Sequence, residues 1–342
     1  MQSSTVRLTV ALGVALMLAS STAVAQYQIT NLVSNQFGQA KHDDPLLVNA
    51  WGLAYGPGNP FWISDEQTGW STVYNAAGVK QGIEVVVPSA SGSGPGSPTG
   101  IVFNGSNDFQ IDGWPTFFIF ATLDGTISGW SPQTNPNQTI IQVNNSGTSA
   151  SYTGLAITNH ASGNHLFAAD QAHNQIDMYD GTFTLVTSFT DPTVPAGFAP
   201  FGIQDIDGLV FVSFAATSGG PGGYIDIFSE DGVFLKRLTQ GGVLNQPWGF
   251  AAAPRNFGPL SNTLLITNNI NNDGTINAFN ALTGQFVGTM TDTNGKAIHI
   301  DQLWGIAFGG GTAANGATNE LFFTAGPDNN WAGTFGSIAF KP

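Results

Sequence analysis

Short runs of alternating apolar and polar residues fill most of the chain and end at glycine, proline, asparagine or aspartate. Alternation with a period of two predicts β-strands with one buried face. One triplet opens each group of runs: an aromatic residue or Thr, then Gly, then an aliphatic residue or Phe. The six copies are Trp51-Gly52-Leu53, Thr99-Gly100-Ile101, Thr153-Gly154-Leu155, Phe201-Gly202-Ile203, Trp248-Gly249-Phe250 and Trp304-Gly305-Ile306.

The triplets recur at a nearly constant spacing, because successive glycines are 48, 54, 48, 47 and 56 residues apart. A second apolar run and a third, alternating run follow each triplet, and Asp-Gly pairs indicate hairpin turns between runs. Three strands and a weaker fourth, repeated six times, predict an all-β, six-bladed β-propeller. Two adjacent β-sandwiches, the alternative, do not explain one triplet at one spacing.

The last repeat ends near the C-terminus, which leaves no room for its fourth strand. The segment 27–33 alternates like a strand but belongs to no complete repeat. We therefore expect this N-terminal strand to pair in the last blade, where it closes the ring and covers an open edge. Residues 26–342 form a single propeller domain in this interpretation.

Residues 1–25 have the order of a secretory signal peptide. Arg7 precedes an apolar run over residues 8–17, and Ala23-Val24-Ala25 resembles a cleavage site. The run is too short to span a bilayer, so we expect no membrane span. Cleavage near Ala25 predicts a secreted or periplasmic protein.

Composition and charge limit the classes of molecule that the protein is expected to bind. The chain has no cysteine, which excludes disulfides and cysteine-based metal sites. Its net charge is −14, and its eight Lys and Arg residues form no cluster, which disfavours nucleic acid as a partner. We expect a monomer that binds a small molecule, a glycan or a protein.

Two segment patterns carry a resemblance to known proteins. The pattern of a small residue, Gly and Ile, then an apolar strand that ends in Asp or Asn, then Ile-x-x-Phe/Tyr, resembles NHL-repeat six-bladed propellers. The runs Asn31-Leu32-Val33-Ser34, Asp44-Pro45-Leu46-Leu47-Val48-Asn49-Ala50-Trp51-Gly52 and Phe61-Trp62-Ile63-Ser64-Asp65 are similar to the opening of a family of uncharacterised exported bacterial proteins. The resemblance implies the propeller fold and export, and it implies no activity.

The residue before each triplet glycine should line the central channel, where equivalent positions of the blades form a ring. In one arrangement the aromatic rings pack together and seal the channel. In the other they expose their faces to a ligand, and polar residues upstream fix its orientation. The candidate binding residues are Trp51, Thr99, Thr153, Phe201, Trp248 and Trp304, with Asn49 and Asp301 on the rim.

Catalysis and cofactors are not predicted. Propeller enzymes of the lactonase type place Glu, Asn and Asp in the channel to hold calcium, whereas the inferred channel positions here are aromatic or Thr. The segment Asp205-Ile206-Asp207-Gly208 is compatible with a structural calcium loop, but it also fits a plain hairpin turn. The five histidines, His42, His160, His165, His173 and His299, are scattered, and we expect them to be solvated.

These observations predict a secreted, non-catalytic binding or scaffold protein that uses one channel mouth. Two alternatives stay open. An extracellular hydrolase or lyase requires converging carboxylates, amides or histidines in the channel. A structural matrix or surface component requires a sealed channel and an apolar outer patch.

Overall fold

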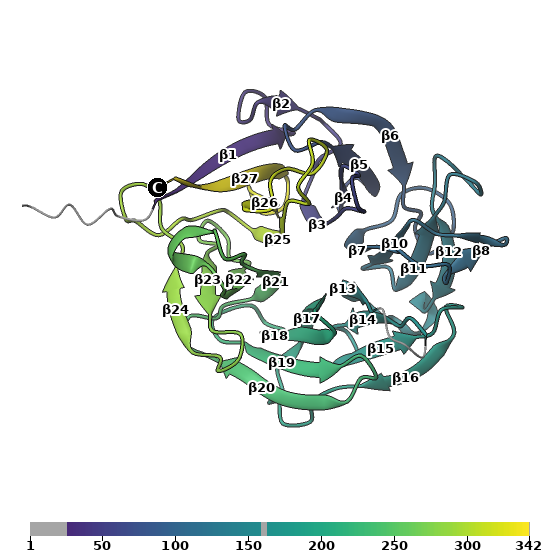
Figure 1. The fold of residues 1–342 in the computed structure, drawn as a ribbon. Helices are drawn as coiled ribbons and strands as arrows, with labels where there is room; N and C mark the ends of the chain where they lie inside the picture. The colour runs from purple at the N-terminus through teal and green to yellow at the C-terminus, as the bar shows by residue number, and fades with distance from the viewer. Residues whose placement is uncertain (1–25, 159–162, 342) are drawn as a thin grey trace, which may run out of the picture.

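The computed structural model describes residues 26–158 and 163–341, so the predicted signal peptide lies outside the described residues. Six β-sheets stand around one axis, five with four strands and one with five (Figure 1). Within the described residues, the helical elements are the single-turn segments η1 (Ser146–Thr148) and η2 (Gly258–Leu260). None of the described helices is long and apolar enough to cross a bilayer. The chain is an all-β, six-bladed β-propeller, as the triplet spacing predicted.

Every triplet lies on the innermost strand of a blade. The inner strands are β3 (Ala50–Ala54), β7 (Pro98–Phe103), β13 (Tyr152–Ile157), β17 (Phe198–Ile206), β21 (Pro247–Ala252) and β25 (Leu303–Phe308). The second strands are β4 (Phe61–Asp65), β10 (Phe118–Thr122), β14 (Leu166–Asp170), β18 (Leu209–Ala216), β22 (Leu264–Asn268) and β26 (Glu320–Ala325). The third strands are β5 (Trp70–Tyr74), β11 (Thr126–Trp130), β15 (Gln175–Tyr179), β19 (Tyr224–Ser229), β23 (Ile276–Phe279) and β27 (Thr334–Lys341).

The fourth, outer strands of the blades are β6 (Lys80–Val86), β12 (Ile140–Asn144), β16 (Leu185–Phe189), β20 (Phe234–Gln240), β24 (Phe286–Thr289) and β1 (Gln26–Ser34). Two further features were not indicated by the sequence. The short strand β2 (His42–Asp43) pairs in parallel with β1 on its outer side. A two-stranded hairpin, β8 (Gln110–Ile111) and β9 (Trp114–Pro115), is inserted in the second blade.

The N-terminal strand closes the ring, as predicted. Strand β1 pairs antiparallel with β27 along its whole length, from Gln26 opposite Lys341 to Ser34 opposite Thr334. It also contacts the fifth blade, where the Tyr27 hydroxyl donates to the Phe257 carbonyl oxygen at 2.6 Å. The backbone N–H of Leu260 donates to that hydroxyl at 3.2 Å. The sixth blade therefore contains both ends of the domain.

The triplet glycines allow neighbouring inner strands to lie close together. A Cβ atom on Gly202 would overlap the carbonyl group of Trp248 in the next blade, and one on Gly52 would overlap the carbonyl oxygen of Thr99. The triplet glycines are buried, as expected for positions at the channel. Glycine is required here because only a residue without a side chain permits this approach of two backbones.

Hydroxyl groups join neighbouring inner strands in five of the blades. In the fifth blade, Thr267 Oγ1 accepts from the Gly249 N–H at 2.7 Å and donates to the Trp304 carbonyl oxygen at 2.9 Å. Ser213 accepts from the Gly202 N–H and donates to the Pro247 carbonyl oxygen in the fourth blade, and Thr324 accepts from the Gly305 N–H and donates to the Trp51 carbonyl oxygen in the sixth. We call this group the inter-blade hydroxyl.

In the second and third blades the inter-blade hydroxyl comes from the inner strand. Thr99 Oγ1 donates to the Tyr152 carbonyl oxygen at 2.6 Å, and Thr153 Oγ1 donates to that of Phe201 at 2.8 Å. The second strands of these two blades carry Ala121 and Ala169, which have no hydroxyl. The first blade carries Ser64 at this position, where its hydroxyl is buried without a partner.

Candidate functional site

Four aromatic side chains fill the centre of the ring at the ends of the inner strands where those strands begin. They are Trp51, Phe201, Trp248 and Trp304, each 3–9% exposed, and we call them the aromatic plug. The rings of Trp51 and Trp304 are stacked with centroids 3.7 Å apart. The Trp248 ring stands edge-on to both, at 6.4 Å and 5.9 Å. The indole faces thus contact one another, which is the sealed arrangement of the two considered.

Hydrogen bonds fix two of the three indoles. Trp304 Nε1 donates to Asn49 Oδ1 at 2.8 Å, and Asn49 Nδ2 donates to Glu66 at 2.9 Å. Trp248 Nε1 donates to the Thr153 carbonyl oxygen at 2.9 Å. The Nε1 atom of Trp51 is buried without a partner. Asn49, which orients Trp304, adopts a left-handed backbone conformation with φ 49°. This conformation is uncommon for a non-glycine residue.

The remaining predicted binding residues have other contacts. The hydroxyls of Thr99 and Thr153 serve as inter-blade hydroxyls. Asp301 accepts from the backbone N–H groups of Asn272 and Asp328, outside the aromatic plug. The structure therefore brings Asn49 together with the four aromatic residues, and ligand binding by this set stays a prediction.

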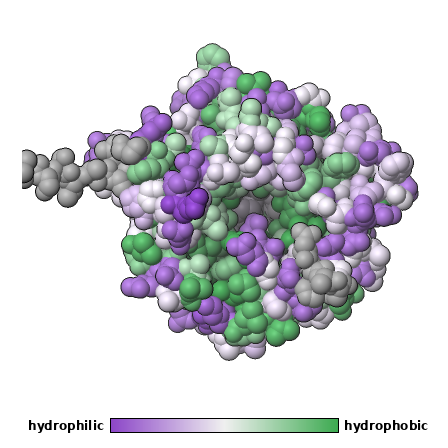
Figure 2. Space-filling model, viewed as in Figure 1, coloured by the Kyte–Doolittle hydropathy of each residue, from purple (hydrophilic) through white to green (hydrophobic). Residues whose placement is uncertain are grey.

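The opposite end of the channel is open. All six inner strands end around a cavity of about 400 Å³, which we call the cup. A hollow at the centre of the ring, with hydrophobic residues along its wall, is visible in Figure 2. Toward the aromatic plug the cup narrows to a space of about 30 Å³, lined by triplet glycines and Trp248. The cup is a blind pocket whose inner end is the aromatic plug.

The cup wall is almost entirely apolar. Its described lining residues are Leu53, Ala54, Tyr55, Ile101, Val102, Phe103, Ile157, Gln204, Ile206, Phe250, Ala251, Ala252, Ile306, Ala307 and Phe308. Among them, the polar side-chain groups are the exposed amide of Gln204 and the Tyr55 hydroxyl. That hydroxyl donates to the Phe308 carbonyl oxygen at 2.8 Å, and burial raises the pKa of Tyr55. The cup therefore offers apolar contact area and one exposed amide, whose Nε2 makes a long contact of 3.4 Å with the Asp205 carbonyl oxygen.

Sequence reasoning did not find the cup, because its residues follow the triplet glycine instead of preceding it. Apolar residues at such positions are also expected in a core. One signal was present two residues after each glycine, where five copies have Ala or Val and the fourth has Gln204. An amide at an otherwise apolar repeat position indicates a local requirement for a polar group.

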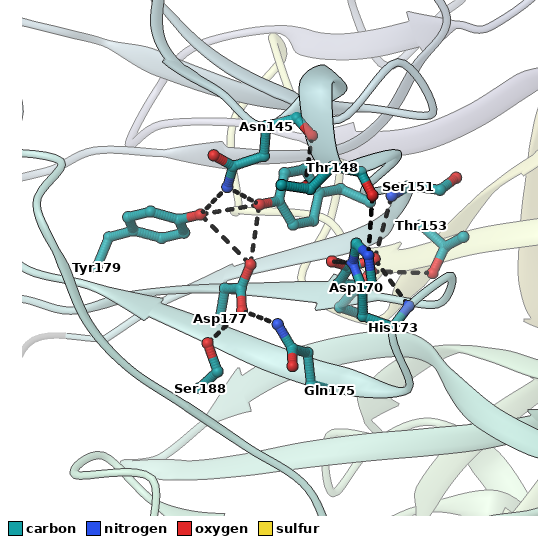
Figure 3. A network of polar contacts seen from close by, with 12 residues as sticks. Asn145, Thr148, Ser151, Thr153, Asp170, His173, Gln175, Asp177, Tyr179 and Ser188 are labelled. Atoms are coloured by element: carbon teal, nitrogen blue, oxygen red, sulfur yellow. Dashed lines mark hydrogen bonds and ion pairs between the residues drawn. The ribbon is translucent and has the colours of Figure 1, made fainter.

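The third blade contains an Asp–His pair, but it lacks the features of an acid–base site (Figure 3). His173 Nδ1 lies 2.6 Å from Asp170 Oδ2, and His173 Nε2 lies 3.0 Å from the Thr148 carbonyl oxygen. The hydrogen bond and charge of Asp170 raise the pKa of His173. Since both ring nitrogens lie beside oxygen acceptors, the imidazole joins two turns and has no unpartnered nitrogen to accept a proton from a substrate.

The carboxylates that end the second strands differ in their contacts. Asp170 Oδ1 accepts from the backbone N–H groups of Ser151 and His173, and Asn268 bonds backbone in the same region of its blade. Asp65 is fully buried, and neither of its carboxyl oxygens has a partner. Burial raises the pKa of Asp65 well above its usual range. Asp170 and Asn268 thus have a structural role, since each bonds backbone groups of the segment that leads into the inner strand of its blade.

Metal ligands do not converge in the part of the chain that the structure describes. No three His, Asp or Glu side chains there are placed to hold an ion. Asp205, in the segment considered for calcium, is half-buried, and burial together with the charge of Glu230 raises its pKa to about 6. His160 lies outside the described residues. A structural calcium ion at this turn stays a prediction.

Solved structures with the same architecture place the chain among the six-bladed β-propellers. A protein of unknown function from Bacteroides thetaiotaomicron aligns over 93% of this chain and 76% of its own, with TM-score 0.58 and 10% identity. A streptogramin B lyase aligns over 94% and 100%, with TM-score 0.54 and 11% identity. Virginiamycin B lyase from Staphylococcus aureus aligns over 92% and 99%, with TM-score 0.50 and 14% identity. At these identities the likeness shows the fold alone.

Relatives in sequence define the family. The uncharacterised protein R648 of Acanthamoeba polyphaga mimivirus is 34% identical over 92% of this chain and 81% of its own length. The uncharacterised protein L690 of the same virus is 30% identical over 92% and 86%. The chain belongs to the family of these mimivirus proteins. No family model matches it. Because these relatives are viral, they do not support the bacterial source that the sequence resemblance implied.

Proposed function

We propose that the protein is an exported, non-catalytic binding scaffold that holds a small, uncharged, largely apolar molecule in the cup. The observation that carries the proposal is the cup itself. Its volume of about 400 Å³ lies within the range of small-molecule sites, about 300–1,000 Å³. Apolar walls with one exposed amide, that of Gln204, match a ligand that has one hydrogen-bonding group on an apolar body.

The chemistry of the cup supports binding over catalysis. Its described lining has no carboxylate, histidine, lysine or serine that could act as a nucleophile, acid or base. The Tyr55 hydroxyl, which faces a carbonyl acceptor and has a raised pKa, is a poor base. An uncharged ligand fits best because neither a cation nor an anion would find a counter-charge on this wall.

Fluorescence titration with the uncharged probe phenylnaphthylamine tests this proposal. We expect saturable binding to the wild-type protein. Ala252→Trp should fill the cup and weaken binding at least about tenfold, a loss of roughly 1.4 kcal/mol. Ala77→Trp, at an exposed turn outside the cup, is the matched control and should bind as the wild type does. Absence of saturable binding, or equal affinity in Ala252→Trp, would contradict the proposal.

A structural role in an assembly is the second candidate. The aromatic plug seals one end of the channel, and exposed apolar side chains lie on three successive outer strands. They are Leu185 and Val186 on β16, Phe234 and Leu235 on β20, and Phe286 and Val287 on β24. Light scattering at increasing protein concentration separates the two candidates: a constant monomer mass supports the binding scaffold, and growth of oligomers that Phe234→Ser prevents supports the assembly.

A further inference from the structure

A second cavity lies on the sixth blade, at the same end of the channel as the aromatic plug. It has a volume of about 340 Å³ and is bounded by β1, the loop after β1, the segment before β25 and the β26–β27 hairpin. Its floor is apolar and includes Ile300 and Phe323, whereas its walls carry the exposed amides of Asn31, Gln36 and Gln39. We call this cavity the blade-six groove.

The two loops beside the groove present the two most exposed aromatic side chains among the described residues. Phe37, next to Gln36, is 91% exposed, and Trp331 in the β26–β27 hairpin is 71% exposed. The loops are joined, since Asn35 Oδ1 accepts from the Gly333 N–H at 2.8 Å. Large aromatic rings left in solvent on two joined loops that border a cavity indicate an interaction site.

The hairpin is held in a conformation that costs energy. Asp328, Asn329 and Asn330 are consecutive and left-handed, with φ values of 57°, 53° and 69°. Asp301 accepts from the Asp328 N–H at 3.0 Å, and Asn271 Nδ2 donates to Asn329 Oδ1 at 2.6 Å. Such conformations persist where the surroundings fix them, and they concentrate at binding sites. Trp331 is therefore presented on a fixed turn.

The charges around the groove exclude most ligand classes. No lysine or arginine is among its described lining residues, and the histidine among them, His299, is paired through Nδ1 with Asp273 at 2.5 Å. Both carboxyl oxygens of Asp301 already accept backbone N–H groups. The net charge of −14 further disfavours anions. The ligand class that remains is a neutral molecule, one that can hydrogen-bond to amide groups and also pack a flat apolar surface against an aromatic ring.

We propose that the blade-six groove binds a neutral polysaccharide. Sugar rings have an apolar face of C–H groups that can stack on Trp331 or Phe37, and their hydroxyls can pair with the amides of Gln36 and Gln39. The groove is separate from the cup, which lies at the other end of the channel. This inference therefore does not depend on the function proposed for the cup.

Native affinity electrophoresis tests the proposal, using gels that contain hydroxyethyl cellulose, soluble starch or laminarin, with anionic alginate for comparison. At least one neutral polymer should retard the wild-type protein, and alginate should not. Trp331→Ala and Phe37→Ala should each weaken that binding at least about tenfold. The thermal stability of both variants should stay near that of the wild type, because both rings are exposed.

Matched controls separate this site from the rest of the surface. Trp114→Ala removes another exposed tryptophan, in the β8–β9 hairpin of the second blade, and should leave retardation unchanged. Ala252→Trp in the cup should also leave it unchanged. The proposal is overturned if none of the three neutral polymers retards the protein, if Trp331→Ala binds as the wild type does, or if Trp114→Ala weakens binding equally.

Discussion

At the scale of single residues, the inter-blade hydroxyl explains why the triplet begins with Thr in two blades and with an aromatic residue in the fourth, fifth and sixth blades; the first blade, where the Ser64 hydroxyl has no partner, is the exception. Where the second strand has alanine, as at Ala121, the inner strand supplies the hydroxyl from Thr99. Where the second strand has Thr267, the inner strand is free to place Trp248 in the plug. The two positions are therefore complementary, a relation that the triplet alone did not reveal.

Moving the hydroxyl between the two strands tests this relation. Thr99→Val should reduce the free energy of unfolding by about 1–3 kcal/mol, because a buried carbonyl group loses its partner. Adding Ala121→Ser should restore at least half of that loss, since the fourth blade has the same arrangement with Ser213. Denaturant unfolding of the single and double variants measures both effects. A double variant no more stable than Thr99→Val would refute the complementarity.

Asp65 gives a pH-dependent prediction. Its pKa is raised by burial, so the folded protein holds a proton that the unfolded chain releases, and this contribution is lost as pH rises above about 4, the unfolded value. Asp65→Asn cannot lose that proton. The thermal stability of the variant relative to the wild type should therefore increase from about pH 4 to about pH 7. A difference that does not change with pH would mean that the carboxyl group finds a partner.

At the scale of secondary-structure elements, alternation and the triplet predicted the blades well because each inner strand needs a glycine and an apolar face. The pairing of β1 with β27 was also predictable, since a strand was left over at one end and missing at the other. The β8–β9 hairpin was not, because two-residue strands are too short to show a period. In the sequence, the inserted hairpin shows mainly as a spacing of 54 residues between the glycines of the second and third triplets.

The contact of β1 with the fifth blade can be measured at Tyr27. Tyr27→Phe removes a hydroxyl that bonds Phe257 and Leu260, and it should lower the free energy of unfolding by about 1–3 kcal/mol. Gln28→Ala changes an exposed neighbour on the same strand and should have little effect. Equal stability of Tyr27→Phe and the wild type would show that the Tyr27 hydroxyl contributes nothing to the closure of the ring.

At the scale of the whole molecule, the channel has two unlike ends: a sealed aromatic plug and an open apolar cup. Trp248 belongs to the plug and also lines the narrow inner end of the cup. Trp248→Ala should therefore destabilise the protein by about 3–5 kcal/mol and deepen the cup. Thermal unfolding and phenylnaphthylamine titration of this variant report the two effects. A stable variant with unchanged probe binding would show that the plug neither supports the ring nor limits the cup.

The chain's sequence predicted a ring of aromatic residues but could not decide between a sealed and an open ring. That choice depends on how the indoles of Trp51, Trp248 and Trp304 meet across the axis, a contact between residues far apart in the chain. The position of the cup depends on the same geometry, since the plug determines which mouth stays open.

A crystal structure of the wild-type protein soaked with phenylnaphthylamine shows whether the cup or the aromatic plug is the ligand site. We expect electron density for one probe molecule in the cup, against Phe250 and within reach of the Gln204 amide, with the three indoles of the plug still in contact. Density between separated indoles at the other end of the channel, or an empty cup at saturating probe, would contradict this expectation.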